Sequence, residues 1–174
     1  SGYKGTYLGK KKVLTVGAAY QYEPDVVYGN TYYQSDAKDY SAYTFDGFFE
    51  YPVKDMGTFT LSGAYAKYDL DDAYQSANPD SAAIGLNGEK NGYYVKAGYM
   101  LPNLPLQFFG RYEQWKFANL NSVINEKVDW YGLGANYYIW GQNLKLTMEY
   151  SKTKYDKESA EDFSNFITQL QVIF

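Results

Sequence analysis

The chain has 174 residues and a formal net charge of −4, and 45% of its residues are hydrophobic. The acidic balance, without a basic cluster beyond residues 10–12, argues against a nucleic-acid partner. The chain contains no His and no Cys, which removes the usual general base of hydrolases, disulfides and Cys-ligated metals, so we expect no enzyme and no cofactor.

Eight runs of alternating residues follow in chain order, and each predicts a β-strand. The runs are residues 14–22, 43–51, 59–66, 93–101, 106–113, 131–139, 144–151 and 166–174. They exceed the usual globular strand of about five or six residues and approach the roughly 9–11 residues that a tilted strand needs to cross a bilayer. No apolar run approaches the roughly 20 residues of a membrane-spanning helix.

The two faces of the predicted strands differ as they do in membrane barrels. One face is broad and rich in aromatic and aliphatic side chains, and 20% of all residues are aromatic. The other mixes Gly, Ala, Ser and Thr with single charged residues, namely Asp46, Glu50, Lys96, Arg111, Glu113, Lys145 and Glu149. The pattern predicts an all-β, transmembrane antiparallel β-barrel of about eight strands, with these nearly balanced charges facing the lumen.

The predicted connections alternate between short and long. Tight turns are expected at residues 52–56, 102–105 and 141–142, and longer polar loops at residues 23–39, 69–90, 118–127 and 154–161. This alternation is typical of barrels whose turns face the periplasm and whose loops are extracellular. Tyr and Trp near both strand ends would form aromatic girdles at the membrane interfaces. The acidic residues 69–72 lack the spacing and Gly of a dedicated calcium loop, so no metal site is expected.

The last run carries an apolar row at the end of the chain. Phe166, Leu170, Val172 and Phe174 share one face of residues 166–174. We expect this face to lie against lipid, because a spanning strand turns its apolar row outward. The row also resembles the C-terminal signal that outer-membrane barrels present to the barrel assembly machinery.

Four segments resemble the C-terminal part of porins of the phosphate-selective porin O/P type. They are GTYLGKKKVLTVGAAYQYE (5–23), YYVKAGYMLPN (93–103), GLGANYYIWGQNLKLTMEYSK (132–152) and FITQLQVIF (166–174). The resemblance implies a pore in the outer membrane of a Gram-negative bacterium, built from about sixteen strands, of which this chain would supply the C-terminal half. The family's anion-binding lysines lie largely in segments without a match here, so phosphate selectivity is not carried over.

Three functions are compatible with these observations. The first is a porin, or its C-terminal part, that lets small hydrophilic solutes, anions among them, diffuse passively. The second is a self-contained eight-stranded barrel, filled by its own side chains, that acts as a surface protein without a pore. The third is a soluble ligand-binding barrel. For a membrane barrel the expected partners are outer-membrane lipid and lipopolysaccharide, the assembly machinery, and either the remaining strands of a parent barrel or further copies of the chain.

Overall fold

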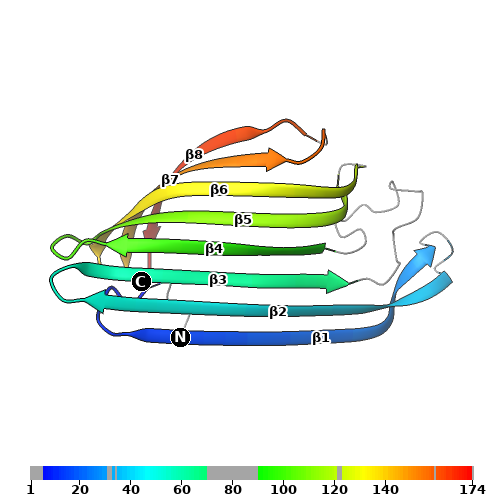
Figure 1. The fold of residues 1–174 in the computed structure, drawn as a ribbon, viewed down its shortest axis with the longest axis horizontal. Coiled ribbons are helices and arrows are strands. Elements are labelled where there is room, and N and C mark those ends of the chain that lie inside the picture. The colour runs from blue at the N-terminus through cyan, green and yellow to red at the C-terminus, as the bar shows by residue number, and fades with distance from the viewer. Residues whose placement is uncertain are drawn as a thin grey trace.

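A computed structural model describes residues 6–30, 33, 35–69, 90–120, 123–158 and 160–173 (Figure 1). Their regular structure is entirely β. The eight strands are β1 (Val13–Asn30), β2 (Ser35–Val53), β3 (Gly57–Asp69), β4 (Lys90–Met100), β5 (Leu106–Leu120), β6 (Val123–Trp140), β7 (Leu144–Tyr155) and β8 (Phe163–Val172). Among these residues there is no helix long and apolar enough to cross a membrane.

The strands form one antiparallel sheet in the order of the sequence, from β1 to β8. The prediction of eight antiparallel strands is confirmed. Figure 1 shows β1 to β6 side by side, with β7 and β8 curving away from them. Within the described ranges, each strand pairs only with the strands next to it in the sequence, and β1 does not pair with β8. Among the described residues the outer edges of β1 and β8 have no strand partner, so these residues form an open sheet and do not show the predicted barrel closed.

Two hairpins are longer than the sequence predicted. Residues 23–39 were expected to form a loop, but the β1–β2 pairing continues to Asn30 and Ser35. Residues 118–127 were also expected to form a loop, but β5 and β6 pair as far as Leu120 and Val123. The side chains in these segments are mostly polar, so the sequence shows no alternation of apolar and polar residues there. The strands pair nonetheless, because backbone hydrogen bonds do not depend on the polarity of the side chains. A bulge between Glu23 and Val27 absorbs Pro24, which has no N–H to donate.

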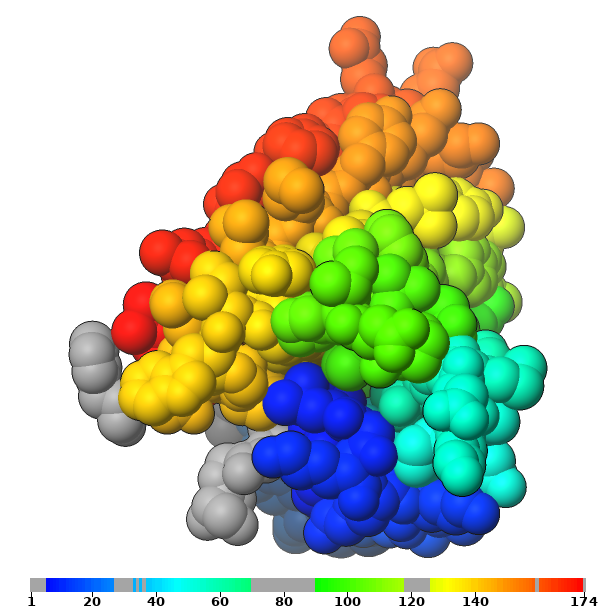
Figure 2. Space-filling model, turned by 90° about the vertical axis from the view of Figure 1, so that its left-hand side faces the viewer, coloured from blue at the N-terminus to red at the C-terminus, as the bar shows by residue number. Residues whose placement is uncertain are grey.

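The short connections all lie at one end of the sheet. The β2–β3 turn closes with a hydrogen bond from Met56 N to Val53 O of 3.1 Å, and the β6–β7 turn with one from Asn143 N to Trp140 O of 3.0 Å. Gly57 has a φ of 107°, a conformation that glycine adopts without strain. We call this the short-turn end; it lies at the left of Figure 1 and faces the viewer in Figure 2. Residues 70–89, which include most of the predicted loop 69–90, lie outside the described residues.

The register keeps the predicted faces together across the whole sheet. Phe48 pairs with Ser62, Ser62 with Lys96, Lys96 with Arg111, and Arg111 with Gly132. These residues all come from the polar face, which we call the inner face. The opposite, outer face exposes large apolar side chains, with Val16 78% exposed and Leu133 70% exposed.

Burial in this sheet is inverted relative to a water-soluble domain. The buried side chains include Thr58, Gln107, Asn136, Ser151 and Thr153, all polar, alongside a few apolar residues such as Phe48 and Phe109. The outer face instead carries aromatic contacts across neighbouring strands. The rings of Tyr93, Tyr112 and Tyr131 form one such row, with successive centroids 5.9 and 5.0 Å apart. An apolar outer surface of this extent is unusual for a soluble monomer.

Candidate functional site

The inner face encloses a cavity of about 730 Å³ that is lined mainly by polar side chains. Three cations reach it: Lys96 from β4, Arg111 from β5 and Lys145 from β7. Lys96 and Arg111 are direct partners in the β4–β5 register. Within the described part of the chain, none of the predicted carboxylates lines this cavity. The seven predicted charges nearly balance over the sequence, and of these only the three cations line the cavity, with Arg111 ion-paired to Glu113 behind it.

Aromatic rings hold two of these cations against the wall. The Nζ of Lys96 lies 4.3 Å from the ring centroid of Phe109. The guanidinium of Arg111 lies between the rings of Tyr94 and Trp130, at 5.0 and 5.3 Å from their centroids. Such cation–π contacts stabilise a charge while keeping its position defined.

Two inner glycines make room for the rings that hold the cations. A Cβ built on Gly134 would lie 2.5 Å from the ring of Phe109, and one built on Gly132 would lie 2.5 Å from the ring of Trp130. The side chain of a larger residue at either position would therefore clash with the ring unless the ring shifted. The inner Gly residues that the sequence pattern grouped only as small have a specific role at these two positions.

The four predicted carboxylates have different surroundings. Glu113 forms an ion pair with Arg111, with Oε2 2.8 Å from Nη2, and it also accepts a hydrogen bond from Trp115 Nε1. Asp46 is exposed and lies across from Gly17. Glu149 lies across from Gly134 and Ile167 on neighbouring strands. Glu50 is completely buried, and its partners come from the segment before β1.

Arg111 has one buried donor without a hydrogen-bond partner despite these contacts. Its Nε is buried and has no hydrogen-bond partner among the described residues. A buried N–H without an acceptor carries a free-energy cost.

A buried polar network that sequence reasoning missed supports the wall beside the cations. Gln107 donates to Thr60 Oγ1 at 3.2 Å and accepts from Asn136 Nδ2 at 3.1 Å and from Tyr138 OH at 3.0 Å. Thr147 Oγ1 donates in turn to Asn136 Oδ1 at 2.6 Å. The only signal in the sequence was that amide and hydroxyl side chains recur at inner-face positions of β3, β5, β6 and β7.

Replacing Gln107 with Leu is expected to destabilise the protein. The substitution leaves the donors of Asn136 and Tyr138 buried without their acceptor, which costs about 1–3 kcal/mol for each group. The free energy of unfolding, measured by urea titration of the folded protein, checks this. The same substitution at Gln169, an exposed inner-face residue of β8, is the matched control and should change that free energy by no more than about 0.5 kcal/mol. Equal effects at the two positions would contradict the role of the network.

The predicted C-terminal row lies on the outer face of β8. Phe166, Leu170 and Val172 are all exposed, and Phe174 lies outside the described residues. The acidic residues 69–72 also fall outside them, except for Asp69. No group of three or more acidic side chains that could hold a metal ion occurs in the described ranges.

Comparison with known proteins finds similarity to an uncharacterized protein. The chain is 33% identical over 92 residues to an uncharacterized protein of Aquifex aeolicus (strain VF5). The match covers 51% of this chain and 22% of that protein, so the chain spans about a fifth of the relative's length. A share of 22% for 92 residues corresponds to a relative of about 420 residues. No protein-family model and no solved structure matches the chain.

Proposed function

We propose that this chain forms part of the wall of an outer-membrane porin through which small hydrophilic solutes, anions in particular, diffuse passively. The observation that carries the proposal is the polarity of the sheet. Its outer face exposes large apolar side chains on all eight strands, whereas its inner face is mainly polar, apart from Phe163 and Ile167 on β8, and has three cations around a cavity. A sheet with these faces suits lipid on one side and water on the other.

The unpaired edges of β1 and β8 favour a pore over the two alternatives. A spanning strand needs partners for its backbone amides, because lipid offers none. Further strands would therefore have to join both edges, and a barrel of more than eight strands has room for a water-filled lumen. The length of the Aquifex aeolicus relative, more than twice that of this chain, is consistent with additional strands. In a soluble barrel, exposed apolar side chains such as Val16 and Leu133 would instead have to be shielded from water by another part of the protein or by a partner.

In this proposal the aromatic rows of the outer face lie at the membrane interfaces, in contact with phospholipid and lipopolysaccharide. Phe166, Leu170 and Val172 contribute to the signal that the barrel assembly machinery reads. The solutes pass along the inner face, where Lys96, Arg111 and Lys145 make the passage more favourable for anions than for cations.

Single-channel recording tests the proposal. Full-length protein extracted from outer membranes and added to a planar lipid bilayer in KCl is expected to produce stepwise increases in conductance. In a KCl gradient the reversal potential should have the sign of an anion-preferring pore. Protein heated before addition, and thereby unfolded, is the control and should produce no steps. A folded, membrane-inserted protein without conductance would contradict the porin and favour the filled barrel.

A further inference from the structure

The segment before β1 lies on the inner face of the sheet, at the short-turn end. We call residues 6–9 the N-terminal strap. Thr6 is 2% exposed, and the ring of Tyr7 packs at a centroid distance of 6.5 Å from that of Phe48 on β2. On the other side, Gln142 in the β6–β7 turn donates a hydrogen bond of 2.8 Å to Thr6 O. The strap therefore connects β2 with a turn that lies four strands away in the sheet (Figure 2).

The buried carboxylate of Glu50 anchors the strap. Its Oε2 accepts hydrogen bonds from Thr6 Oγ1 at 2.6 Å and from Tyr7 N at 2.9 Å, and its Oε1 accepts from Gly9 N at 2.9 Å and from Tyr7 N at 3.2 Å. Leu8 and Gly9 have φ values of 56° and 73°, and these turn the backbone N–H groups toward the carboxylate. Hydrogen bonds to an ionised acceptor are among the strongest in proteins, and they compensate for the burial of its charge.

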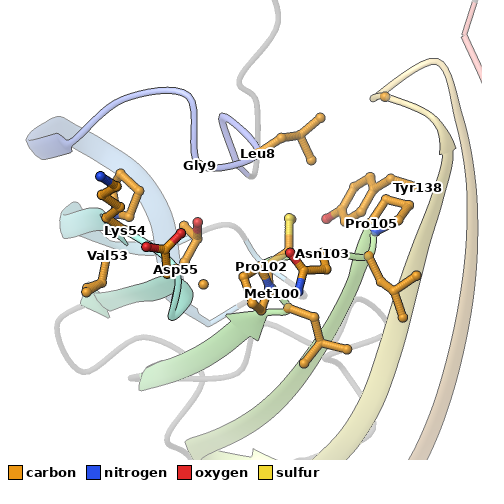
Figure 3. Close-up of a pocket in the computed structure, with 16 residues that line it drawn as sticks. Leu8, Gly9, Val53, Lys54, Asp55, Met100, Pro102, Asn103, Pro105 and Tyr138 are labelled. Carbon is orange, nitrogen blue, oxygen red and sulfur yellow. The ribbon is translucent and has the colours of Figure 1, made fainter.

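The strap lies between two cavities of the inner face. Thr6 and Gln142 line the cation-lined cavity of about 730 Å³. Leu8 and Gly9 line a second cavity, of about 500 Å³, whose other walls are the β2–β3 and β4–β5 turns. Figure 3 shows Leu8 projecting from the strap into the space between these turns and Tyr138. A solute that moves along the inner face from one cavity to the other has to pass the strap.

We propose that the strap forms the constriction of the pore at its short-turn end, and that Glu50 is the positioning residue that holds it there. This inference rests on the proposed function. It assigns to Glu50 a mechanical role, in contrast to Lys96, Arg111 and Lys145, which face the solute. The strap sets the width of the passage, and the cations set which ions favour it.

Glu50→Gln is expected to increase the single-channel conductance. The amide offers one acceptor oxygen in place of two, and its own N–H₂ group faces the N–H groups of the strap, so the strap is released from β2. We expect an increase of about twofold or more, because the narrowest section dominates the resistance of a pore. Thr6→Val removes the hydroxyl that donates to Glu50 and accepts from Leu8 N, but keeps the backbone bonds to the carboxylate. It is a second and milder variant and should change the conductance in the same direction.

Asp46→Asn is the matched control for the loss of charge. Asp46 lies on the inner face of β2, four residues before Glu50, and is exposed. Its neutralisation removes the same charge from the same strand and leaves the strap attached, so any change in conductance should be small compared with that of Glu50→Gln. Heat-modifiable migration of each variant in gel electrophoresis verifies that it has folded and inserted.

A reversible disulfide distinguishes two explanations of a larger conductance, namely release of the strap and general damage to the barrel. A Cβ built on Gly9 lies 3.5 Å from Cβ of Thr58 on β3, within the range that a disulfide requires, and the strain that a side chain meets at the φ of 73° of Gly9 is the same in the oxidised and reduced protein. The 174 residues contain no Cys that could interfere. Adding Gly9→Cys and Thr58→Cys to Glu50→Gln should give wild-type conductance when oxidised and the larger conductance when reduced. The reduced protein carries the same substitutions and is therefore its own control.

The outcomes distinguish this inference from the proposed function. Wild-type conductance in Glu50→Gln, or a conductance in the triple variant that does not respond to reduction, would overturn the constriction and leave the porin standing. A wild-type protein that inserts without conducting would overturn both. The constriction would be supported if Glu50→Gln gave larger conductance steps and if oxidation of the two engineered cysteines in the triple variant restored the wild-type conductance.

Discussion

Replacing Lys96, Arg111 and Lys145 together with Glu is expected to reverse the ion preference of the proposed pore. The three side chains line one cavity, and the described residues place no carboxylate in its lining. Charged groups at a narrow passage attract counter-ions and repel ions of their own sign, an effect that low-dielectric walls strengthen. The triple substitution turns three positive charges into three negative ones, so the reversal potential in a KCl gradient should change sign.

A second triple variant controls for the overall change in charge. Lys67, Lys116 and Lys152 lie on outer-face positions of β3, β5 and β7, and their replacement with Glu alters the net charge by the same amount. Because these side chains do not line the cavity, the reversal potential should keep the wild-type sign. A sign change in both variants, or in neither, would contradict the assignment of selectivity to the three inner cations.

Leu61→Arg is expected to prevent stable insertion into membranes. Leu61 lies on the outer face of β3 and is 50% exposed. An arginine on the lipid face of a barrel strand costs about 2–4 kcal/mol at the bilayer midplane. In a soluble barrel the same substitution at a half-exposed position would change the free energy of unfolding by no more than about 0.5 kcal/mol. The fraction of protein that folds into lipid vesicles, measured by heat-modifiable migration, reports the effect.

The neighbouring residue offers a matched control for this substitution. Ser62 lies on the inner face and lines the cation-lined cavity. Ser62→Arg places the same side chain one residue further along β3, on the side that we propose to be water-filled. It should insert normally and alter only conduction. Equal insertion of the two variants would show that the faces of β3 do not meet different environments.

The sequence predicted the strands well, because period-two alternation is a local property. The clearest runs, such as residues 144–151, fall inside the observed strands, and the register keeps their predicted inner residues on one face. The strand ends were less predictable. Asn30 and Ser35 pair through backbone hydrogen bonds, and their polar side chains gave no sign of a strand.

The site depends on contacts that no local pattern contains. Glu50 was predicted to face the lumen, yet it is buried by residues more than 40 positions away in the chain. The contact between Lys96 and Arg111 follows from the β4–β5 register, which the turn at residues 102–105 sets only approximately. Barrel closure is likewise a property of all strands together, because an alternating pattern is the same in barrels of eight strands and of sixteen.

Labelling of single cysteines along β3 tests the central claim most directly, since the chain has no Cys of its own. Single substitutions to Cys at residues 59 to 66 would be exposed in intact outer membranes to a charged, water-soluble thiol reagent. The proposed pore predicts that Thr60, Ser62, Ala64 and Ala66 variants react and that Phe59, Leu61, Gly63 and Tyr65 variants do not. Labelling of the Phe59 and Leu61 variants, or protection of all eight, would contradict a sheet with lipid on its outer face and water on its inner face.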